Sequence, residues 1–443
     1  MLRFPHPMTL LVGFVLLGAL LTWVLPAGSY DRQQDPATGR EVVVAGTYHA
    51  VGPAPVGLFE ALVAIPKGLI EAADVVFLVF LSGAAFTVVD ATGAMRRAVD
   101  WLVVRLRGRT LLVIPLLSVI FALGGVLSNM QEEFIALIPA LLVLTRRMGF
   151  DPLVAVATSL GVAAVGAAFS PIDPFQVGIA QKLAQLPLLS GWAFRTAFLV
   201  VAVGIWIWAT VRYATRLRTE PEAETDAVDA TIHGRDAVVL LLVLVAFAVY
   251  VFGILRLGWG FNEMSALFFA MGVAAGLVGR LGIDGTVEAY IQGFRDLAFA
   301  GLLIGFARAI FVVLDEGRIV DTIVHGLVTP IVGLPLAVSA LGMMLVHVLI
   351  HFPVPSVSSQ AVLTMPVLVP VSDILGLSRQ VTVLAYQYGA GLTELVTPTN
   401  GALMAILIAA GVPYQRWLRF VLPIFLGLMA LGVVAVIVAI GVF

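Results

Sequence analysis

Apolar runs long enough to cross a bilayer as helices recur from one end of this chain to the other. Of its 443 residues, 60 % are hydrophobic and only 12 % are charged, unlike an average soluble domain. A membrane barrel would instead show short segments of alternating polarity. We therefore predict an all-α integral membrane protein. The first run, Met8 to Pro26, is longer than the apolar core of a signal peptide and ends without a small-x-small cleavage site. We therefore count it as a membrane span.

The basic residues indicate the orientation, because short loops rich in Lys and Arg remain in the cytoplasm. They form three groups: Arg96, Arg97, Arg105, Arg107 and Arg109; Arg146 and Arg147; and Arg212, Arg216, Arg218 and Arg235 in a polar linker. Placing all three inside predicts a protein of the cytoplasmic (inner) membrane with a cytoplasmic N-terminus. An ordinary crossing between the first two groups would place one of them outside. We therefore predict a re-entrant hairpin that enters at Thr110, turns at Ser128 to Gln131 and returns to Arg146.

The two halves of the sequence match each other at a constant offset of 227 residues. The aligned landmarks are Pro139 with Pro366, Gly149 with Gly376, and Ser170-Pro171 with Thr397-Pro398. Several landmarks at one offset argue against a chance match. An odd number of crossings per half makes the copies antiparallel, as in the inverted repeats of many secondary transporters. The predicted units are 1–212 (hairpin 111–147, broken helix 152–183), a cytoplasmic linker 213–235, and 236–443 (hairpin 331–375, broken helix 379–411).

Each half carries two polar interruptions in otherwise apolar sequence. They are "LSNMQEEF" (127–134), "FSPIDPFQVG" (169–178), "FPVPSVSSQ" (352–360) and "VTPTNGAL" (396–403). Their prolines break helices, because proline lacks the N–H and disfavours helix in the residue before it. Helix fragments beyond each break then aim their ends at a site near the bilayer midplane. N-terminal ends favour anions there, and loose carbonyls favour cations.

Several stretches together resemble the YfcC-type carriers of the four-carbon dicarboxylate anaerobic carrier family. They include "LPAGSYDR", "EEFIALIPALLVL", "FSPIDPFQVGIAQKLA" and "LTELVTPTNG", and the resemblance covers nearly the whole chain. It implies the ion transporter superfamily fold, in which two inverted repeats, each with a hairpin and a broken helix, assemble as a homodimer with elevator-type motion. Members of the family are associated with amino acids, notably arginine and ornithine exchange, and with dicarboxylates.

The chain departs from this family at the second hairpin tip and the second break. Relatives usually read "PSGSGQA" and "GDGFTNLISPTSG" at these places. Here Val357 and Ser359 replace the glycines, Ala390 replaces the acid and Glu394 replaces the asparagine. These changes alter the shape and the charge of the expected site, so the substrate of better-known relatives does not transfer directly.

In the first half, the candidates for substrate or ion binding are Ser128, Asn129, Gln131, Glu132, Glu133, Ser170 and Asp173. A carboxylate within the membrane is costly unless it is protonated, paired or bound to a cation, which favours a functional role. Helix capping is the alternative for Glu132 and Glu133. An Asx turn between two prolines is the alternative for Asp173.

In the second half, the candidates are Arg308, Ser356, Ser358, Ser359, Gln360, Glu394, Thr397, Thr399 and Asn400. Their hydroxyls and amides suit a carboxylate or a partly dehydrated sodium ion. Arg308 either pairs with a structural acid such as Asp315 or Glu316, or binds a substrate carboxylate. His347 and His351 share a helix face and could bind metal or carry protons, but a structural role is the more common one for such a pair.

Two amphipathic segments, 56–74 and 284–298, occupy matching places in the two halves. They could link a static scaffold to a moving domain, or lie on the bilayer surface, or both.

We expect a secondary active transporter rather than a channel or an enzyme. A channel would be expected to carry a filter that oligomer symmetry repeats, rather than two hairpins within one chain. Against an enzyme, neither of the hydrolase motifs H-E-x-x-H and G-x-S-x-G occurs. First-half acids could face an amine or guanidinium, while second-half hydroxyls and Arg308 face a carboxylate. This arrangement favours an amino acid as the substrate, a basic one included; a dicarboxylate is the alternative. Sodium near the tips and breaks, a proton, or a counter-substrate is the expected coupling species. We expect no other cofactor and no nucleic acid.

Overall fold

The computed structural model describes residues 7–34, 41–105, 110–218, 233–257, 259–331 and 334–443. The elements of the first half are α1 (Pro7–Val24), β1 (Gly28–Ser29), β2 (Arg32–Gln34), β3 (Glu41–Val43), β4 (His49–Ala50), α2 (Leu58–Glu71), α3 (Ala73–Ala91), α4 (Ala94–Arg105), η1 (Thr110–Leu112), α5 (Val113–Ser128), η2 (Glu132–Leu137), α6 (Ile138–Arg147), α7 (Pro152–Val156), η3 (Ala157–Gly161), α8 (Val162–Ala168), η4 (Pro174–Gly178), α9 (Ile179–Leu183) and α10 (Trp192–Arg216).

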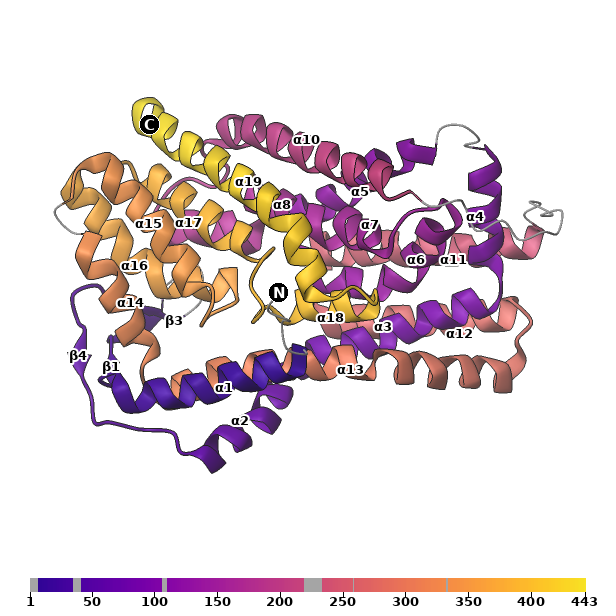
Figure 1. Ribbon diagram of the computed structural model, residues 1–443, viewed down its shortest axis with the longest axis horizontal. Helices are drawn as coiled ribbons and strands as arrows, with labels where there is room; N and C mark the ends of the chain where they lie inside the picture. Colours follow the sequence, from indigo (N-terminus) through magenta and orange to yellow (C-terminus); the bar gives the residue numbers. More distant parts are fainter. Residues whose placement is uncertain (1–6, 35–40, 106–109, 219–232, 258, 332–333) are drawn as a thin grey trace.

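Those of the second half are α11 (Gly234–Leu257), α12 (Phe261–Val278), α13 (Gly282–Glu316), α14 (Val320–Val328), η5 (Thr329–Ile331), α15 (Leu336–Ile350), α16 (Val357–Leu375), α17 (Arg379–Thr393), α18 (Gly401–Ala409) and α19 (Tyr414–Val442). Figure 1 shows α1, α3, α12 and α13 along one side of an elongated bundle, and α10 and α19 along the other. Between these two layers lie the segments predicted as hairpins, α5 to α6 and α15 to α16, and the interrupted helices that follow them; we keep the names first and second hairpin for these segments. The strands lie at one end of the bundle and α4 at the other.

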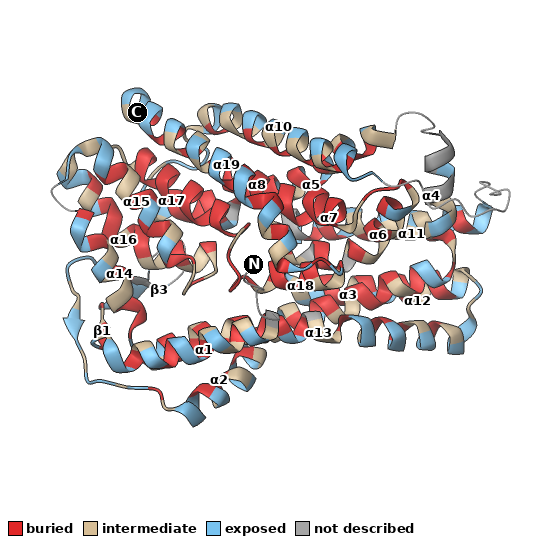
Figure 2. Ribbon diagram, viewed as in Figure 1, coloured by how far each residue is buried: buried red, intermediate tan, exposed pale blue. Residues whose placement is uncertain are grey.

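Polarity in this bundle is distributed as expected for a protein surrounded by lipid. Within the described residues, seven helices are long and apolar enough to cross a membrane. On the outer layers, Leu20 and Trp208 are 60 % and 62 % exposed, whereas Arg195 and Gln387 are fully buried inside. Figure 2 shows the buried residues concentrated in the central helices. The protein is therefore a multi-pass, mostly helical membrane protein.

The segments aligned at an offset of 227 residues have the same local structure. Gly149 and Gly376 both adopt a positive φ, +73° and +69°, which a glycine tolerates best. At the same places Phe150 N donates to Thr145 O, and Leu377 N donates to Ser372 O. The next helices begin with matching caps, in which Asp151 accepts from Leu153 N and Ser378 accepts from Gln380 N. The inverted orientation of the two halves, and their boundaries, stay predictions.

The central helices are interrupted where the polar motifs occur. In the first half the chain leaves helix α8 at Phe169 and resumes at Pro174; in the second it leaves α17 at Glu394 and resumes at Gly401. Residues 129–131 join α5 to η2, with Asn129 at φ +51°, and residues 351–356 join α15 to α16. Close backbone approach holds the first interruption in place, because a Cβ on Gly125 of α5 would lie 2.1 Å from Ala163 O of α8.

The expectation of a wholly helical chain is wrong for residues 28–34 and 41–50, which we call the strap. Two small antiparallel sheets form here, β1 with β4 and β2 with β3. The segment is polar and contains "VVV" and "TYHA" runs that favour extended structure, and it lies outside the apolar spans.

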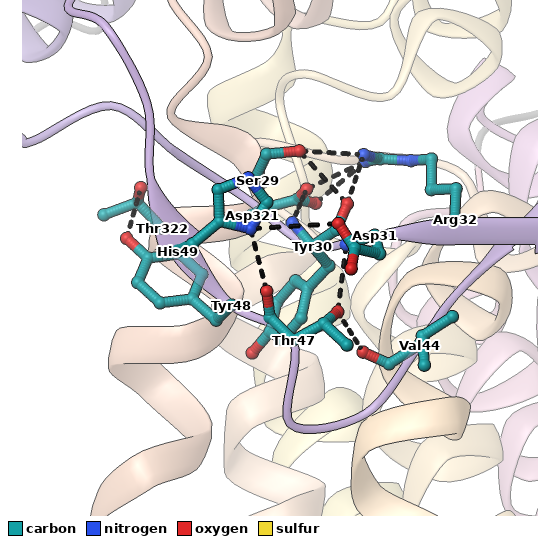
Figure 3. Close-up of polar contacts among 10 residues, drawn as sticks. All are labelled: Ser29, Tyr30, Asp31, Arg32, Val44, Thr47, Tyr48, His49, Asp321 and Thr322. Carbon is teal, nitrogen blue, oxygen red and sulfur yellow. Dashed lines mark hydrogen bonds and ion pairs between the residues drawn. The ribbon is translucent and has the colours of Figure 1, made fainter.

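Asp321, at the start of α14, attaches the strap to the helical bundle (Figure 3). Its carboxylate accepts from Tyr30 N at 3.0 Å and from Arg32 Nη2 at 2.9 and 3.0 Å. Tyr48 stacks on His325 with ring centroids 4.0 Å apart. Burial, with the charges of Asp321 and Tyr48, raises the pKa of Tyr30 to about 12, so its phenol keeps the proton that it can donate to His325 Nδ1 at 3.1 Å. The strap is therefore bound to α14 by charge and by ring stacking.

Replacing Asp321 with Asn should loosen the strap, because charge-assisted hydrogen bonds are worth about 1.5–3 kcal/mol. We expect trypsin to cut after Arg32 roughly 10- to 100-fold faster in Asp321→Asn, as long as opening is fast relative to cleavage. Asp31→Asn is the matched control, since the Asp31 side chain is 65 % exposed and lies 3.9 Å from His49. Equal cleavage rates in the two variants would contradict this attachment.

Candidate functional site

Both hairpin tips and the second break meet around two adjoining cavities in the middle of the bundle. The first cavity, about 350 Å³, is lined by Asn129, Gln131, Glu132, Phe175, Tyr250, Trp259, Gly260, Phe261, Pro355, Ser356, Val357, Ser358, Glu394 and Asn400. The second, about 300 Å³, lies toward α2, α3 and α13. Glu132, Pro355, Ser356 and Asn400 line both cavities, so the two adjoin at these residues.

Ten of the sixteen predicted residues line these cavities. They are Asn129, Gln131, Glu132, Arg308, Ser356, Ser358, Ser359, Glu394, Thr399 and Asn400. The side chains of Ser128 and Glu133 lie outside the described part of the structure. Ser170, Asp173, Gln360 and Thr397 are not among the lining residues.

A hydrogen bond between Gln131 and Glu394 joins the two halves at the first cavity. Gln131 Nε2 donates to Glu394 Oε2 and, at 2.9 Å, to Asn129 Oδ1. Gln131 and Glu394 are only 2 % and 6 % exposed. Among the described residues that line this cavity, Glu132 and Glu394 are acidic and none is basic. The first cavity is therefore a negatively charged compartment as long as these carboxyl groups are ionised.

The second cavity contains both signs of charge. Its described lining includes Glu71, Asp74 and Glu132, and one basic residue, Arg308. Arg308 Nε donates to Glu71 Oε2 at 2.8 Å, and its guanidinium lies 4.8 Å from the centre of the Phe311 ring. Taken together, the described residues that line the two cavities include four carboxylates and one guanidinium.

Arg308 does pair with an acid, which was one of its two predicted roles, but the partner is neither Asp315 nor Glu316. Arg308 pairs with Glu71, and Glu316 pairs with Lys67. The reason is that α2 lies against the C-terminal half of α13, so that Glu71, the last residue of α2, lies beside Arg308. A Cβ on Gly68 of α2 would lie 2.5 Å from Gly305 O of α13. A salt bridge to Glu71 leaves the substrate-binding role of Arg308 a prediction.

Two helix N-termini also point at the cavities. Ser356 caps α16, its Oγ accepting from Ser359 N at 3.4 Å, and Asn400 caps α18, its Oδ1 accepting from Leu403 N at 3.1 Å. Both capping residues line both cavities. The N-terminal ends of helices carry partial positive charge and favour anions. The site therefore combines anion-favouring helix ends with cation-favouring carboxylates.

The residues that lie outside the cavities hold the breaks together. Ser170 Oγ donates to Val126 O at 2.7 Å and accepts from Asp173 N at 2.9 Å. Asp173 Oδ1 accepts from Phe175 N at 2.8 Å, which is the Asx turn considered above, while its buried Oδ2 has no partner among the described residues. Thr397 Oγ1 donates to Thr393 O at 2.7 Å, within its own turn.

Gln360 lies between the two histidines of the second hairpin. Its Oε1 lies 3.2 Å from His351 Nδ1, and its Nε2 donates to His347 O at 2.7 Å. All three side chains are fully buried. In the described residues no group of three or more His, Cys, Asp or Glu could hold a metal ion. These contacts favour the structural role for the histidine pair.

Sequence reasoning missed the aromatic wall of the first cavity. Tyr250, Trp259 and Phe261 come from α11, α12 and the turn between them. The short "LGWGFNEM" turn between two spans was the available signal, but nothing local indicated that it faces the hairpin tips. Glu71 and Asp74, which line the second cavity, belong to the amphipathic segment 56–74.

Sequence reasoning also missed a buried arginine network. Arg195 of α10 donates through Nε to Gln387 Oε1 and through Nη2 to Gln380 Oε1, both at 3.0 Å, and through Nη1 to Ser190 O at 2.7 Å. Gln387 Nε2 donates to Ser170 O at 2.6 Å. Arg195 therefore connects α10 through α17 to the first break.

A third cavity extends from the second cavity toward the strap. It has a volume of about 290 Å³, and its lining includes Arg32 and Glu41 of the strap and Asp315 of α13. Phe311 and Ser359 line both this cavity and the second one. These two side chains therefore stand between the central site and the strap end of the molecule.

The chain is similar to a family of carriers over nearly its full length. A family model described as C4-dicarboxylate anaerobic carrier matches residues 4–441. A putative basic amino acid antiporter of Escherichia coli, YfcC, is 32 % identical over 94 % of this chain and 93 % of its own length. An uncharacterized protein of Haemophilus influenzae is 28 % identical over 100 % of this chain and 98 % of its own.

Two solved structures are also similar. MtrF of Neisseria gonorrhoeae, from a class of antimetabolite efflux pumps, covers 100 % of this chain and 96 % of its own, with 19 % identity and a TM-score of 0.44. The YdaH transporter of Alcanivorax borkumensis covers 98 % of both chains, with 18 % identity and a TM-score of 0.42. Both scores lie below 0.5, so neither carries weight for the details of the site.

Arg195→Lys should destabilise the protein, because one ammonium group cannot reach the three acceptors that the guanidinium reaches. Each buried acceptor left unpaired costs about 1–3 kcal/mol. We expect thermal unfolding in detergent to begin several degrees lower. Arg216→Lys on the exposed last turn of the same helix is the matched control, and equal melting temperatures for the two variants would contradict the role of the network.

Phe311→Ala should open the path from the strap end to the central site. The chain has no cysteine, so Ser356→Cys provides a unique thiol in the site. We expect a membrane-impermeant maleimide added at the strap side to label this thiol several-fold faster in the Phe311→Ala background. Phe306→Ala, on the same helix, should leave the rate unchanged. Unchanged labelling in both backgrounds would exclude Phe311 as the barrier.

Proposed function

The chain belongs to the C4-dicarboxylate anaerobic carrier family, and on that premise we propose that it is a secondary active transporter of a basic amino acid. The observation that carries the substrate class is the charge of the two central cavities. In the described part of the lining there are four carboxylates and one guanidinium, and one of the four, Glu71, is already paired with Arg308. Asp74, Glu132 and Glu394 remain to meet a positively charged ligand.

The carboxylate end of an amino-acid substrate must also be bound. An amino acid also needs an anion-favouring contact, and the capped N-termini of α16 and α18 with Arg308 offer one. The cavity volumes of about 350 and 300 Å³ are at the lower end of the roughly 300–1,000 Å³ range of small-molecule sites. The E. coli relative, a putative basic amino acid antiporter, is consistent with this assignment.

The mechanism that we propose is alternating access of the elevator type in a homodimer. The hairpins and broken helices form the moving part, and α1, α3, α12 and α13 form the scaffold against which η2 and α18 pack. The coupling species is sodium, a proton or a counter-substrate. Glu394 and Glu132 are the residues that would exchange a proton or an ion for the substrate's positive end, because both ligands would occupy the same carboxylates.

A dicarboxylate is the second candidate. Arg308 and the two helix N-termini would hold its carboxylates, and the family model is described by such substrates. In that case the cavity acids must be protonated or bound to sodium when the substrate binds, because ionised acids would repel the carboxylates of the substrate.

Counterflow in proteoliposomes distinguishes these candidates. Vesicles loaded with unlabelled arginine or ornithine should accumulate labelled arginine, whereas loading with succinate should have no effect. A channel would equilibrate the label without accumulation. Accumulation of label in vesicles loaded with succinate, with none in vesicles loaded with arginine or ornithine, would contradict the amino-acid assignment.

Glu394→Gln and Glu132→Gln should each weaken arginine binding roughly 10- to 150-fold, because a hydrogen bond to a charged group is worth about 1.5–3 kcal/mol. Apparent affinity is measured from the concentration dependence of counterflow. Glu288→Gln removes an exposed acid of α13 outside the cavities and should leave affinity unchanged. Unchanged affinity in both cavity variants would assign the glutamates to capping and structure.

A further inference from the structure

Trp259, in the turn between α11 and α12, differs from the other tryptophans of the chain. Trp206 and Trp417 are fully buried, and the Nε1 of each donates to a backbone carbonyl at 2.8 Å. The remaining four are 44 % to 65 % exposed, namely Trp23, Trp101, Trp192 and Trp208. Trp259 is partly buried and lines the first cavity, and its Nε1 has no hydrogen-bond partner in the part of the chain that the structure describes. Its place is therefore neither that of a core tryptophan nor that of one on the outer surface.

Two backbone hydrogen bonds fix the turn that carries Trp259. Trp259 N donates to Gly253 O of α11 at 3.2 Å, and Gly260 N donates to the side-chain carboxylate of Glu263 of α12 at 2.9 Å. The indole also lies directly on α11, because a Cβ on Gly253 would come within 2.2 Å of its six-membered ring. A glycine at this position allows the ring to approach the backbone so closely. The position of the ring is therefore set before any ligand binds.

The first cavity presents this indole and two acidic side chains to the same space. Glu132 comes from the first hairpin and Glu394 from the second break, whereas Trp259 and Phe261 come from the α11–α12 turn and the start of α12. A cavity of about 350 Å³ is the size that one small molecule fills. A single ligand there therefore meets both carboxylates and the aromatic wall.

We infer that Trp259 is a specificity-determining residue, which stacks on a guanidinium group and so makes the site prefer arginine to lysine or ornithine. This inference rests on the proposed function, since the positive end of the substrate must lie in the first cavity. A guanidinium offers N–H donors along its edge for carboxylates and a flat, weakly hydrated face for an aromatic ring. An ammonium group has no flat face and is more strongly hydrated. Tryptophan is the aromatic side chain that attracts a cation most strongly.

A quaternary ammonium is the other cation that aromatic rings attract. It has no N–H group, so it could not donate to Glu132 or Glu394, which line the same cavity. A buried acceptor that is left without a donor is costly. The carboxylates beside the indole therefore favour a guanidinium over a quaternary ammonium.

The test measures the affinity of the purified full chain in detergent for L-arginine and L-lysine by isothermal titration calorimetry. Trp259→Leu should weaken arginine binding about 5- to 30-fold, the equivalent of about 1–2 kcal/mol, and lysine binding much less. Trp259→Phe keeps an aromatic face and should give an intermediate preference. Trp192→Leu, at an exposed tryptophan of α10, is the matched control and should bind both amino acids as the wild type does.

Gly253→Ala tests the position of the ring from outside the cavity. Its added Cβ must displace the indole of Trp259, so the preference for arginine over lysine should fall as it does in Trp259→Leu. Alanine is the better helix former, which favours a folded variant. Gly204→Ala of α10 is the matched control, because a Cβ there would meet nothing within 4 Å.

Intrinsic fluorescence gives a readout that a merely structural tryptophan would not move. Arginine should change the fluorescence of the wild type and of Trp192→Phe, but not that of Trp259→Phe, which still binds it. If the wild type binds arginine and lysine, and Trp259→Leu weakens both equally or neither, the specificity role is overturned while the proposed function stands. If the wild type binds neither amino acid, or binds glycine betaine in their place, the proposed function fails and this inference fails with it.

Discussion

Every backbone N–H and C=O that this chain exposes within the bilayer must be satisfied by the protein itself or by what it encloses. The helices are nevertheless interrupted at residues 169–173 and 394–400. Side chains make this possible: Ser170 and Asp173 take up N–H groups at the first break, and Asn400 does so at the second. Because such ends cannot face lipid, they turn inward. The central cavities are the consequence of that constraint.

The two halves depend on each other at these ends. Gln131 of the first hairpin tip donates to Glu394 of the second break, and Ser358 of the second hairpin donates to Phe175 O of the first broken helix at 2.8 Å. Arg195 and Gln387 add a third link between the halves, through Ser170. Neither half can therefore form the site alone, and a change at one break should be felt at the other.

The charged side chains differ between regions of the molecule. The described lining of the central cavities contains four carboxylates and one guanidinium, whereas Arg96, Arg146 and Arg147 lie at the α4 end of the bundle. At the opposite end the strap contacts α14 and α16, so that the second hairpin is flanked by strap residues as the first is flanked by α4.

The sequence by itself determined the features that depend on neighbouring residues: apolar runs for spans, proline and capping residues for the interruptions, and glycines such as Gly149 and Gly376 for the helix ends. These features are local, because capping and proline chemistry act within a few residues. The matched caps Asp151 and Ser378 show how far a 227-residue repeat in sequence extends into structure.

Only the tertiary structure decided which of these elements meet. The partner of Arg308 is Glu71 rather than Asp315 or Glu316, and the wall of the first cavity is Tyr250, Trp259 and Phe261. Among the arginines that the structure describes, Arg195 is the one that is fully buried, and it lies among amides. Helical periodicity states which face of a helix is apolar but not which helix it packs against, and in a chain where nearly every helix is apolar, that choice is made by packing across the whole bundle.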